Sequence, residues 1–195
     1  MRLAELADRV RAAPPRLGGT RLVLVDGPAG SGKTTLAGRL AAALDSGAGP
    51  APVVHLDDLY AGWTLDGVVE RLTAWVLDPL AAGRDAHFAG YDWAAGDFRV
   101  PTTVPAADVL VVEGCGAGAR SLADVAGLLV WVEAPPATCA RRWAARGGAA
   151  MTAHQPAWAA EEAVVFAREG TRARADLRVD GAPLHDPGPD LVALA

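Results

Sequence analysis

Five short segments of the chain consist almost entirely of apolar residues. They span residues 21–26, 52–57, 108–114, 127–133 and 176–180. A strand that faces solvent on one side alternates apolar and polar residues, whereas a strand covered on both faces is apolar throughout. The pattern therefore predicts five parallel strands in a sheet that is buried on both faces.

Helix-like stretches lie between these predicted strands. They span residues 33–44, 65–82, 119–126, 136–147 and 157–169, and an amphipathic helix is predicted at the N-terminus over residues 1–13. Strands that alternate with helices are typical of right-handed crossovers in a doubly wound α/β sheet. Ligands of such sheets bind beyond the carboxyl ends of the strands, so we expect the functional residues directly after each strand.

Length and composition narrow the class of protein. A chain of 195 residues suits one domain, and we expect residues 1–195 to form a single domain. Its longest apolar runs are shorter than the ~20 residues that span a bilayer, and its N-terminal helix is too charged for a signal peptide. The net charge of -5 argues against a nucleic-acid partner. We expect a cytoplasmic protein that acts on a small molecule, without membrane or nucleic-acid partners, and no pattern defines its oligomeric state.

The loop after the first predicted strand contains a complete phosphate-binding motif. Residues 27–34 read GPAGSGKT, which matches G-x-x-x-x-G-K-[ST]. Glycines let backbone N–H groups turn toward an anion, and the positive end of the following helix points at the same place. Lys33, the only lysine in the chain, would reach the β- and γ-phosphates of ATP, and Thr34 would bind Mg²⁺. The predicted nucleotide-binding residues are Gly27, Gly30, Ser31, Gly32, Lys33, Thr34 and Thr35.

Carboxylates follow the second and third predicted strands. Asp57 and Asp58 come at the end of the second strand, and Glu113 comes at the end of the third. In a parallel sheet these residues would lie beside the phosphate loop. A carboxylate there can bind Mg²⁺ or its waters, or accept the proton of an attacking hydroxyl. Thr34, Asp57 and Glu113 are the predicted magnesium-binding residues.

Taken together, these segments resemble the uridine kinase and phosphoribulokinase group of P-loop kinases. The resemblance rests on GPAGSGKTT, LDDLY, YDW and VVEG, in this order, followed by an arginine-rich helix, and it extends from about Arg21 to about Gly147. It implies a three-layer P-loop NTPase fold around a five-stranded sheet, with ATP and Mg²⁺ as cofactors. The chain departs from the usual pattern at Trp93-Ala94, where His-Pro is usual, and at Arg142, where an aspartate is usual.

The resemblance also implies roles for individual residues. Asp57 matches the catalytic aspartate of the group, and Glu113 matches the acid near the metal. Arg141 and Arg146 resemble the lid arginines that neutralise the transferred phosphoryl group, within a small lid around residues 141–155. With Lys33, these residues form the predicted catalytic set. The predicted acceptor-binding residues are Asp58, Tyr60, Tyr91 and Asp92, of which the last three rest on the resemblance.

We predict that the protein transfers the γ-phosphoryl group of MgATP to a hydroxyl of a nucleoside-like or other polyol-bearing metabolite. Acids surround the expected acceptor site, and they disfavour an acceptor that already carries phosphate, which would favour arginines. These acids are Asp57, Asp58, Asp92 and Asp97. A nucleoside monophosphate kinase and a nucleotide-dependent switch or accessory ATPase are the alternatives. The single lysine excludes the N-K-x-D and T-K-x-D segments of a GTPase.

Further residues are weaker candidates for the site. Large aromatic residues of an α/β domain more often belong to the core than to a pocket. His154 is expected in an exposed loop, and Arg142 could either help the lid or face solvent. The aromatic candidates and the remaining histidine are Trp63, His87, Phe98, Trp143 and Trp158.

Overall fold

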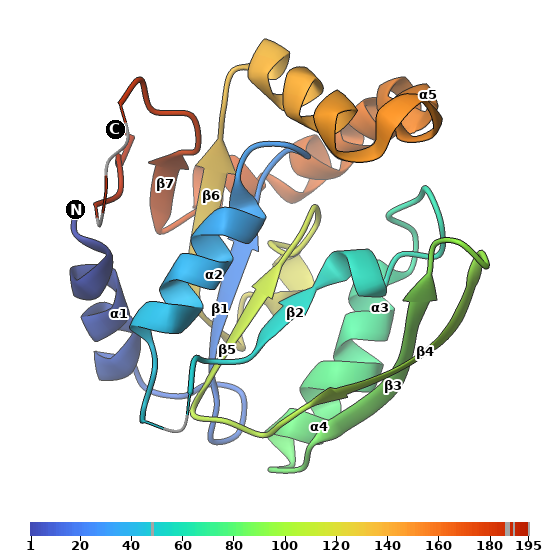
Figure 1. Cartoon of the computed structure of the whole chain (residues 1–195). Helices are drawn as coiled ribbons and strands as arrows, with labels where there is room; N and C mark the ends of the chain where they lie inside the picture. Colours follow the sequence, from blue (N-terminus) through green and yellow to red (C-terminus); the bar gives the residue numbers. More distant parts are fainter. Residues whose placement is uncertain (48, 186–187, 189, 195) are drawn as a thin grey trace.

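The computed structural model describes residues 1–47, 49–185, 188 and 190–194. Its centre is a sheet of five parallel strands in the order β2-β5-β1-β6-β7, drawn as arrows in Figure 1. The strands are β1 (Arg21–Asp26), β2 (Val53–His55), β5 (Val109–Glu113), β6 (Ala126–Glu133) and β7 (Leu177–Asp180). All five predicted strands are confirmed, and neighbouring strands pair in parallel as expected.

Different helices cover the two faces of this sheet. Val23 and Val25 of β1 belong to one apolar cluster together with residues of α1 (Leu3–Ala12) and α2 (Lys33–Ala43). Leu22 and Leu24 belong to a second cluster on the opposite face. Because successive residues of a strand point to opposite faces, the continuous apolar run of β1 serves both clusters. The predicted three-layer α/β fold is therefore confirmed.

A helical stretch and a hairpin follow β2. α3 (Val68–Leu72), a π-helical turn η2 (Thr73–Leu77) and α4 (Asp78–Ala81) are continuous, which confirms a helix within the predicted range 65–82. β3 (Ala86–Asp92) and β4 (Asp97–Val104) then form an antiparallel hairpin outside the main sheet (Figure 1). No strand was expected here. Gly90 and Pro101 lie within these two strands, and such residues weaken a strand pattern in the sequence.

The two helices expected after β6 are one helix, α5 (Pro136–Glu169), followed by the short α6 (Thr171–Arg174). A straight helix would separate Trp143 from Trp158 by roughly 22 Å. The centroids of their rings are only 6.3 Å apart, so α5 bends back on itself between them. Figure 1 draws its two halves side by side. Glycines and proline are the residues at which helices bend, and this part of α5 contains Gly147, Gly148 and Pro156.

We call residues 136–146 the outgoing arm of α5 and residues 151–169 its return arm. The bend brings the indole Nε1 of Trp143 within 2.8 Å of the Met151 carbonyl oxygen, which accepts its hydrogen bond. The predicted lid, residues 141–155, lies in this bent region. In the part of the chain that the structure describes, no helix combines the length and apolar character needed to cross a membrane.

The helix predicted over residues 119–126 is wrong. The structure contains only one 3₁₀ turn there, η3 (Arg120–Leu122). The preceding backbone is held by a buried carboxylate, because Asp26 accepts hydrogen bonds from the N–H groups of Gly116 and Gly118 at 3.0 and 2.9 Å. These tertiary contacts keep the chain irregular before it enters β6.

Asp26 ends β1 and is completely buried. It also accepts the N–H of Gly27 at 2.7 Å. Burial raises the pKa of Asp26 to about 6, although its three N–H partners and the nearby Lys33 lower it. The folded protein therefore binds a proton at Asp26 more tightly than the unfolded chain does.

This difference predicts a pH dependence of stability. The stabilisation from the protonated carboxyl is complete below about pH 4, and it is lost as the pH rises through the folded pKa of about 6. Relative to Asp26→Asn, the free energy of unfolding should fall by about 3 kcal/mol over this interval. Urea unfolding of both proteins from pH 4 to 7 measures this difference, and two parallel curves would contradict the prediction.

Candidate functional site

The loop between β1 and α2 requires glycine at several positions. Gly27, Gly30 and Gly32 have φ values of 144°, 81° and 111°, which side chains rarely adopt. A Cβ atom on Gly27 would overlap the Val132 carbonyl oxygen, and one on Gly30 would lie 2.5 Å from the Cys139 carbonyl oxygen. The phosphate loop is therefore packed directly against β6 and α5.

The same loop offers polar groups to an anion. Ser31 is fully buried. Among the described residues, its Oγ is the one buried side-chain oxygen or nitrogen that has no hydrogen-bond partner. α2 begins directly after Gly32, and no side chain caps its N-terminus. An unpaired hydroxyl beside an uncapped helix N-terminus fits a bound phosphate group.

Lys33 lies at the centre of the site. Its side chain is buried, and its Nζ lies 3.0 Å from the Pro28 carbonyl oxygen and 3.5 Å from the Cys115 Sγ. Burial tends to lower the pKa of Lys33, but Cys115 and the acids Glu113 and Glu162 raise it overall. The ammonium group is therefore charged at neutral pH, within reach of the loop.

Glu113, Thr34 and His55 form a second group beside Lys33. Glu113 Oε1 accepts a hydrogen bond from the Thr34 hydroxyl at 2.9 Å and lies 2.7 Å from His55 Nδ1. Burial tends to raise the pKa of Glu113, but His55, Lys33 and Thr34 together lower it. The hydrogen bond to Glu113 raises the pKa of His55. The carboxylate thus stays ionised beside the first turn of α2.

These residues fit a magnesium ion that is shared with a nucleotide. In the described ranges no three His, Cys, Asp or Glu side chains gather into a metal cluster. Mg²⁺ does not need such a cluster, because it usually takes one or two carboxylates, several waters and substrate phosphates. The Thr34 hydroxyl and Glu113, which are hydrogen-bonded to each other, would supply the protein ligands, and Asp57 as a third ligand stays a prediction.

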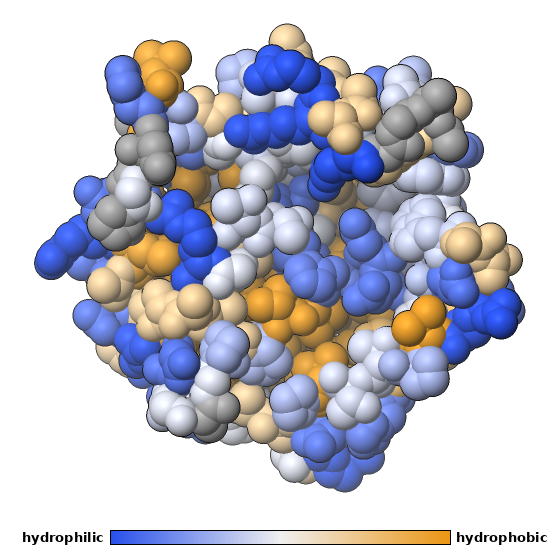
Figure 2. Space-filling view, viewed as in Figure 1, coloured by the Kyte–Doolittle hydropathy of each residue, from blue (hydrophilic) through white to orange (hydrophobic). Residues whose placement is uncertain are grey.

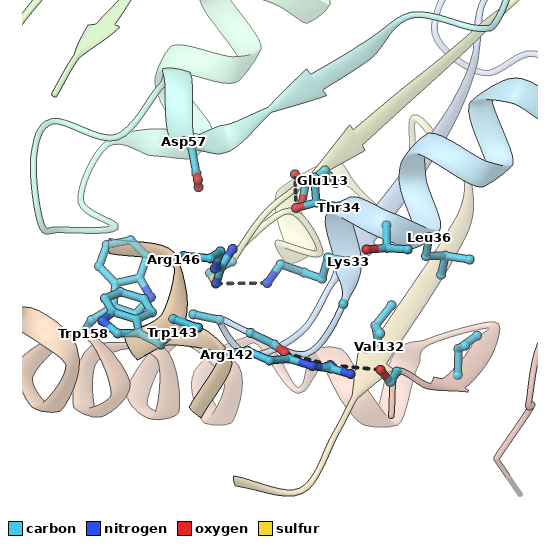
Figure 3. A pocket seen from close by; sticks show the side chains of 18 of the residues that line it. Lys33, Thr34, Leu36, Asp57, Glu113, Val132, Arg142, Trp143, Arg146 and Trp158 are labelled. Carbon is cyan, nitrogen blue, oxygen red and sulfur yellow. Dashed lines mark hydrogen bonds between the residues drawn. The ribbon is translucent and has the colours of Figure 1, made fainter. Parts of the chain in front are cut away.

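A cavity of about 1090 Å³ extends over the phosphate loop. The surface is hollowed below α5, whose upper side carries hydrophilic side chains (Figure 2). Figure 3 shows Lys33, Thr34 and Glu113 in its middle, Trp143 and Trp158 toward one end and Leu36 and Val132 toward the other. The second end also includes residues of the C-terminal segment, namely Gly181, Pro183, Leu191 and Val192.

Six aromatic side chains line one end of the cavity, which we call the aromatic chamber. They are Tyr60, Trp63, Trp93, Trp143, His154 and Trp158. Trp63 lies at their centre, with its ring centroid 4.5 Å from that of His154 and 4.7 Å from that of Trp93. The Tyr60 hydroxyl donates to the Cys115 carbonyl oxygen at 3.0 Å, so the ring is fixed. Trp63, Trp143, Trp158 and His154, weak candidates by sequence, belong to this chamber.

Asp57 faces the cavity between the chamber and Lys33 (Figure 3). It lies in a 3₁₀ turn, η1 (Leu56–Asp58), and its backbone carbonyl accepts the indole N–H of Trp93 at 3.0 Å. The cavity walls raise the pKa of Asp57, and the negative charge of Glu113 adds to this effect. Asp57 is thus a better proton acceptor than an ordinary aspartate, while its carboxylate is open to the cavity.

Two arginines of the outgoing arm also line the cavity. Arg142 donates to the carbonyl oxygens of Gly30, Ser31 and Gly181 at 3.1, 3.3 and 3.0 Å, which ties the phosphate loop to the end of β7. Arg146 lies one turn further along the helix and faces the same cavity (Figure 3). Its positive charge lowers the pKa of Asp57.

Apart from Gly27 and Ser31 of the phosphate loop, four predicted site residues are not among those that line the cavity. Arg141 precedes Arg142 on α5, points to another side and lies 3.4 Å from the Thr138 hydroxyl. Asp92 accepts the N–H groups of Ala94 and Ala95, both at 3.0 Å, and so caps the hairpin turn. Tyr91 packs on Phe98 of the same hairpin, and Asp58 lies beside Gly90.

The remaining predicted residues are brought together. Gly30, Gly32, Lys33, Thr34, Thr35, Asp57, Tyr60, Glu113 and Arg146 line the cavity, with Gly27 and Ser31 in the loop beneath them. Sequence reasoning missed Glu162, whose carboxylate meets the phosphate loop from α5. No local signal marks it, because it depends on the bend of α5.

The phosphate loop, the strand order and the cavity at the carboxyl edge define a P-loop domain of the kinase-like type. A family model described as AAA domain matches residues 23–162, so the chain belongs to this family. No curated protein matches the chain.

Solved structures are similar to the chain along most of its length. A Bacillus stearothermophilus protein described as a possible uridine kinase shares 21% identity, with a TM-score of 0.66 over 90% of this chain and 96% of that one. A Silicibacter sp. TM1040 protein described as a candidate fructose transport system kinase shares 25% identity, with a TM-score of 0.61 over 91% and 98%. These neighbours confirm the P-loop kinase resemblance at the level of the fold.

The surroundings of Lys33 predict that no other cation can replace it. Lys33→Ala removes the charge beside the phosphates, and the planar guanidinium of Lys33→Arg is too broad for the space between Pro28 and Cys115. Both variants should lose ATP turnover by a factor of about 10² or more, with an unchanged circular dichroism spectrum. Full turnover in either correctly folded variant would contradict this prediction.

Proposed function

We propose that the protein is an ATP-dependent kinase that transfers the γ-phosphoryl group of MgATP to a hydroxyl of a small nucleoside-like or polyol-bearing molecule. The observation that carries this proposal is the position of Asp57, which faces the same cavity as Lys33 and Glu113 and borders the aromatic chamber. A triphosphate on the phosphate loop would leave the chamber open to a second molecule.

The phosphate loop and its neighbours would hold the donor. The N–H groups at the start of α2, the Ser31 hydroxyl and Lys33 would bind the phosphates, and Thr34 and Glu113 would hold Mg²⁺. Bound Mg²⁺ neutralises charge on the β- and γ-phosphates. The cavity end formed by Leu36, Val132 and the C-terminal segment would receive the nucleoside part of ATP.

Asp57 would orient the acceptor. Its carboxylate is open to the cavity, and its raised pKa suits a group that accepts a proton from an attacking hydroxyl. In phosphoryl transfer the base has modest work to do, and positioning together with charge balance supplies most of the rate. Arg146, on the other side of the cavity, would balance the charge of the moving phosphoryl group.

The aromatic chamber suits an acceptor with a flat or apolar part. Trp and Tyr rings pack on planar groups and on the C–H faces of sugars, and they bury large apolar areas. The names of the two similar structures refer to uridine and to fructose, and both of these molecules carry hydroxyl groups. A role of Tyr91 and Asp92 in binding the acceptor stays a prediction.

The alternatives fit the cavity less well. An acceptor that already carries phosphate needs cationic partners, and the arginines that line the cavity in the described ranges are Arg39, Arg142 and Arg146. Arg39 donates to the Asp190 carbonyl oxygen at 3.3 Å, and Arg142 donates to the Gly30 carbonyl oxygen of the phosphate loop. Few guanidinium groups are therefore available to bind a phosphate on the acceptor. A nucleotide-dependent switch would not need an aromatic chamber beside its triphosphate.

A screen of ATP consumption tests the proposed function. The full chain with MgATP is incubated with and without a panel of nucleosides, sugars and other polyols, and ADP release is measured. A kinase responds to at least one acceptor with a phosphorylated product. Slow ADP release that no acceptor changes would favour the switch or accessory ATPase.

The geometry of η1 distinguishes two neighbouring aspartates. Asp57→Asn keeps the shape of the side chain and removes its charge, so MgATP should still bind while acceptor phosphorylation falls by about 10²- to 10⁴-fold. Asp58→Asn serves as the matched control, since Asp58 lies outside the cavity, and its activity should fall much less. Initial rates at saturating MgATP measure both. The reverse order of effects would move the proposed base by one residue.

The outgoing arm of α5 offers a second matched pair. Arg146→Ala should lower kcat by about tenfold or more, with a smaller effect on ATP affinity, because the guanidinium acts on charge that develops in the transition state. Arg141→Ala should have a smaller effect, since Arg141 does not line the cavity. If Arg146→Ala abolished ATP binding but left turnover at saturation normal, Arg146 would be an anchor for bound ATP instead.

A further inference from the structure

Glu162 is a buried acid in the return arm of α5. Only 5% of its surface is exposed. Its Oε1 accepts three hydrogen bonds, from the backbone N–H of Ala29 at 2.8 Å, the Cys115 thiol at 2.7 Å and the Trp158 indole N–H at 2.7 Å. One carboxylate oxygen therefore joins the phosphate loop, the segment after β5 and the aromatic chamber.

Lys33 belongs to the same buried network. Its Nζ lies 3.5 Å from the Cys115 Sγ, which in turn donates to Glu162. The negative charge of Glu162 is one of the influences that raise the pKa of Lys33. A carboxylate removed from water is costly unless hydrogen bonds and an opposite charge compensate it. Here the three donors and Lys33 supply that compensation.

The neighbouring Glu161 holds the return arm on the other side of the cavity. Its Oε1 accepts the Thr64 hydroxyl at 2.9 Å and the Leu65 N–H at 2.7 Å, next to Trp63 of the aromatic chamber. The return arm is thus fixed to the phosphate loop through Glu162 and to the chamber wall through Glu161.

We propose that Glu162 is a positioning residue for the phosphate loop, whose carboxylate oxygen holds Ala29 and, through Cys115, Lys33 in the conformation that binds nucleotide phosphates. This inference rests on the proposed function, since it assumes a nucleotide on the loop. Without the acceptor oxygen, the Ala29 N–H would lack its buried partner. The loop would then turn this N–H toward water, and nucleotide binding would have to restore the original conformation.

The test is the affinity of the full chain for MgADP, which binds without turnover, measured by isothermal titration calorimetry. Glu162→Ala should weaken MgADP at least about tenfold, the scale set by the loss of one hydrogen bond to a charged acceptor. Glu162→Gln keeps an acceptor oxygen of the same reach, so its dissociation constant should stay within about threefold of the original. This rescue separates the acceptor role from the charge.

Glu169→Ala is the matched control. Glu169 lies in the same helix and also accepts a backbone N–H, that of Arg120 at 2.9 Å, whereas Glu162 accepts the N–H of Ala29 in the phosphate loop. The Glu169→Ala variant should bind MgADP as the original chain does, even if its melting temperature falls as much as that of Glu162→Ala. Equal weakening by both variants would show a general loss of stability and would overturn the proposal.

The other outcomes are equally decisive. Unchanged affinity in Glu162→Ala, or a Glu162→Gln variant as weak as Glu162→Ala, would overturn the proposal. If Glu162→Ala does not fold, the titration is replaced by a measurement of amide hydrogen exchange in residues 21–36. It is made without nucleotide on the original chain and on Glu162→Gln. A protected Ala29 amide in the original chain and in Glu162→Gln supports the proposal, and solvent-rate exchange in the original chain overturns it. If the original chain, without any substitution, bound no MgADP, the proposed function itself would be refuted.

Discussion

The close packing of the phosphate loop against its neighbours is the constraint on which the rest of the site depends. At Gly27 and Gly30 the backbone touches β6 and α5 so closely that a Cβ atom would overlap a carbonyl oxygen. Gly181, at the end of β7, has the same relation to the Ser31 carbonyl. Three elements thus hold the loop by backbone contact, before any ligand contributes. A loop fixed in this way can present its N–H groups to a phosphate with little rearrangement.

The bend of α5 makes this loop one wall of the cavity. The outgoing arm brings Arg142 to the loop and Arg146 to the cavity. The return arm brings Trp158 to the aromatic chamber and Glu162 to Ala29 of the loop. The two arms touch through Trp143 and Trp158. Because both arms belong to one helix, a movement of the bend would change the arginines, the chamber and the loop together. The lid around residues 141–155 stays a prediction.

Buried charges around Lys33 balance one another in a small volume. Asp26, Glu113 and Glu162 all attract its ammonium group, and each also accepts hydrogen bonds from the backbone or from side chains. Such groups are costly to bury singly, and the network makes their burial tolerable. It also prepares the site for phosphates and Mg²⁺, since a positive charge and an ionised carboxylate already lie where these would bind.

The sequence by itself determined the five strands, most of the helices, the phosphate loop and the placement of Lys33, Thr34, Asp57 and Glu113 in one site. These features follow from local patterns, because apolar runs, glycine positions and strand ends act through neighbouring residues. Only the tertiary structure decided the bend of α5, the hairpin of β3 and β4, and which arginines face the cavity. The aromatic chamber draws Trp63, Trp93 and Trp158 from three separate segments, and Glu162 meets Ala29 across 133 positions of sequence. Contacts of this kind depend on packing between distant segments, which no local pattern records.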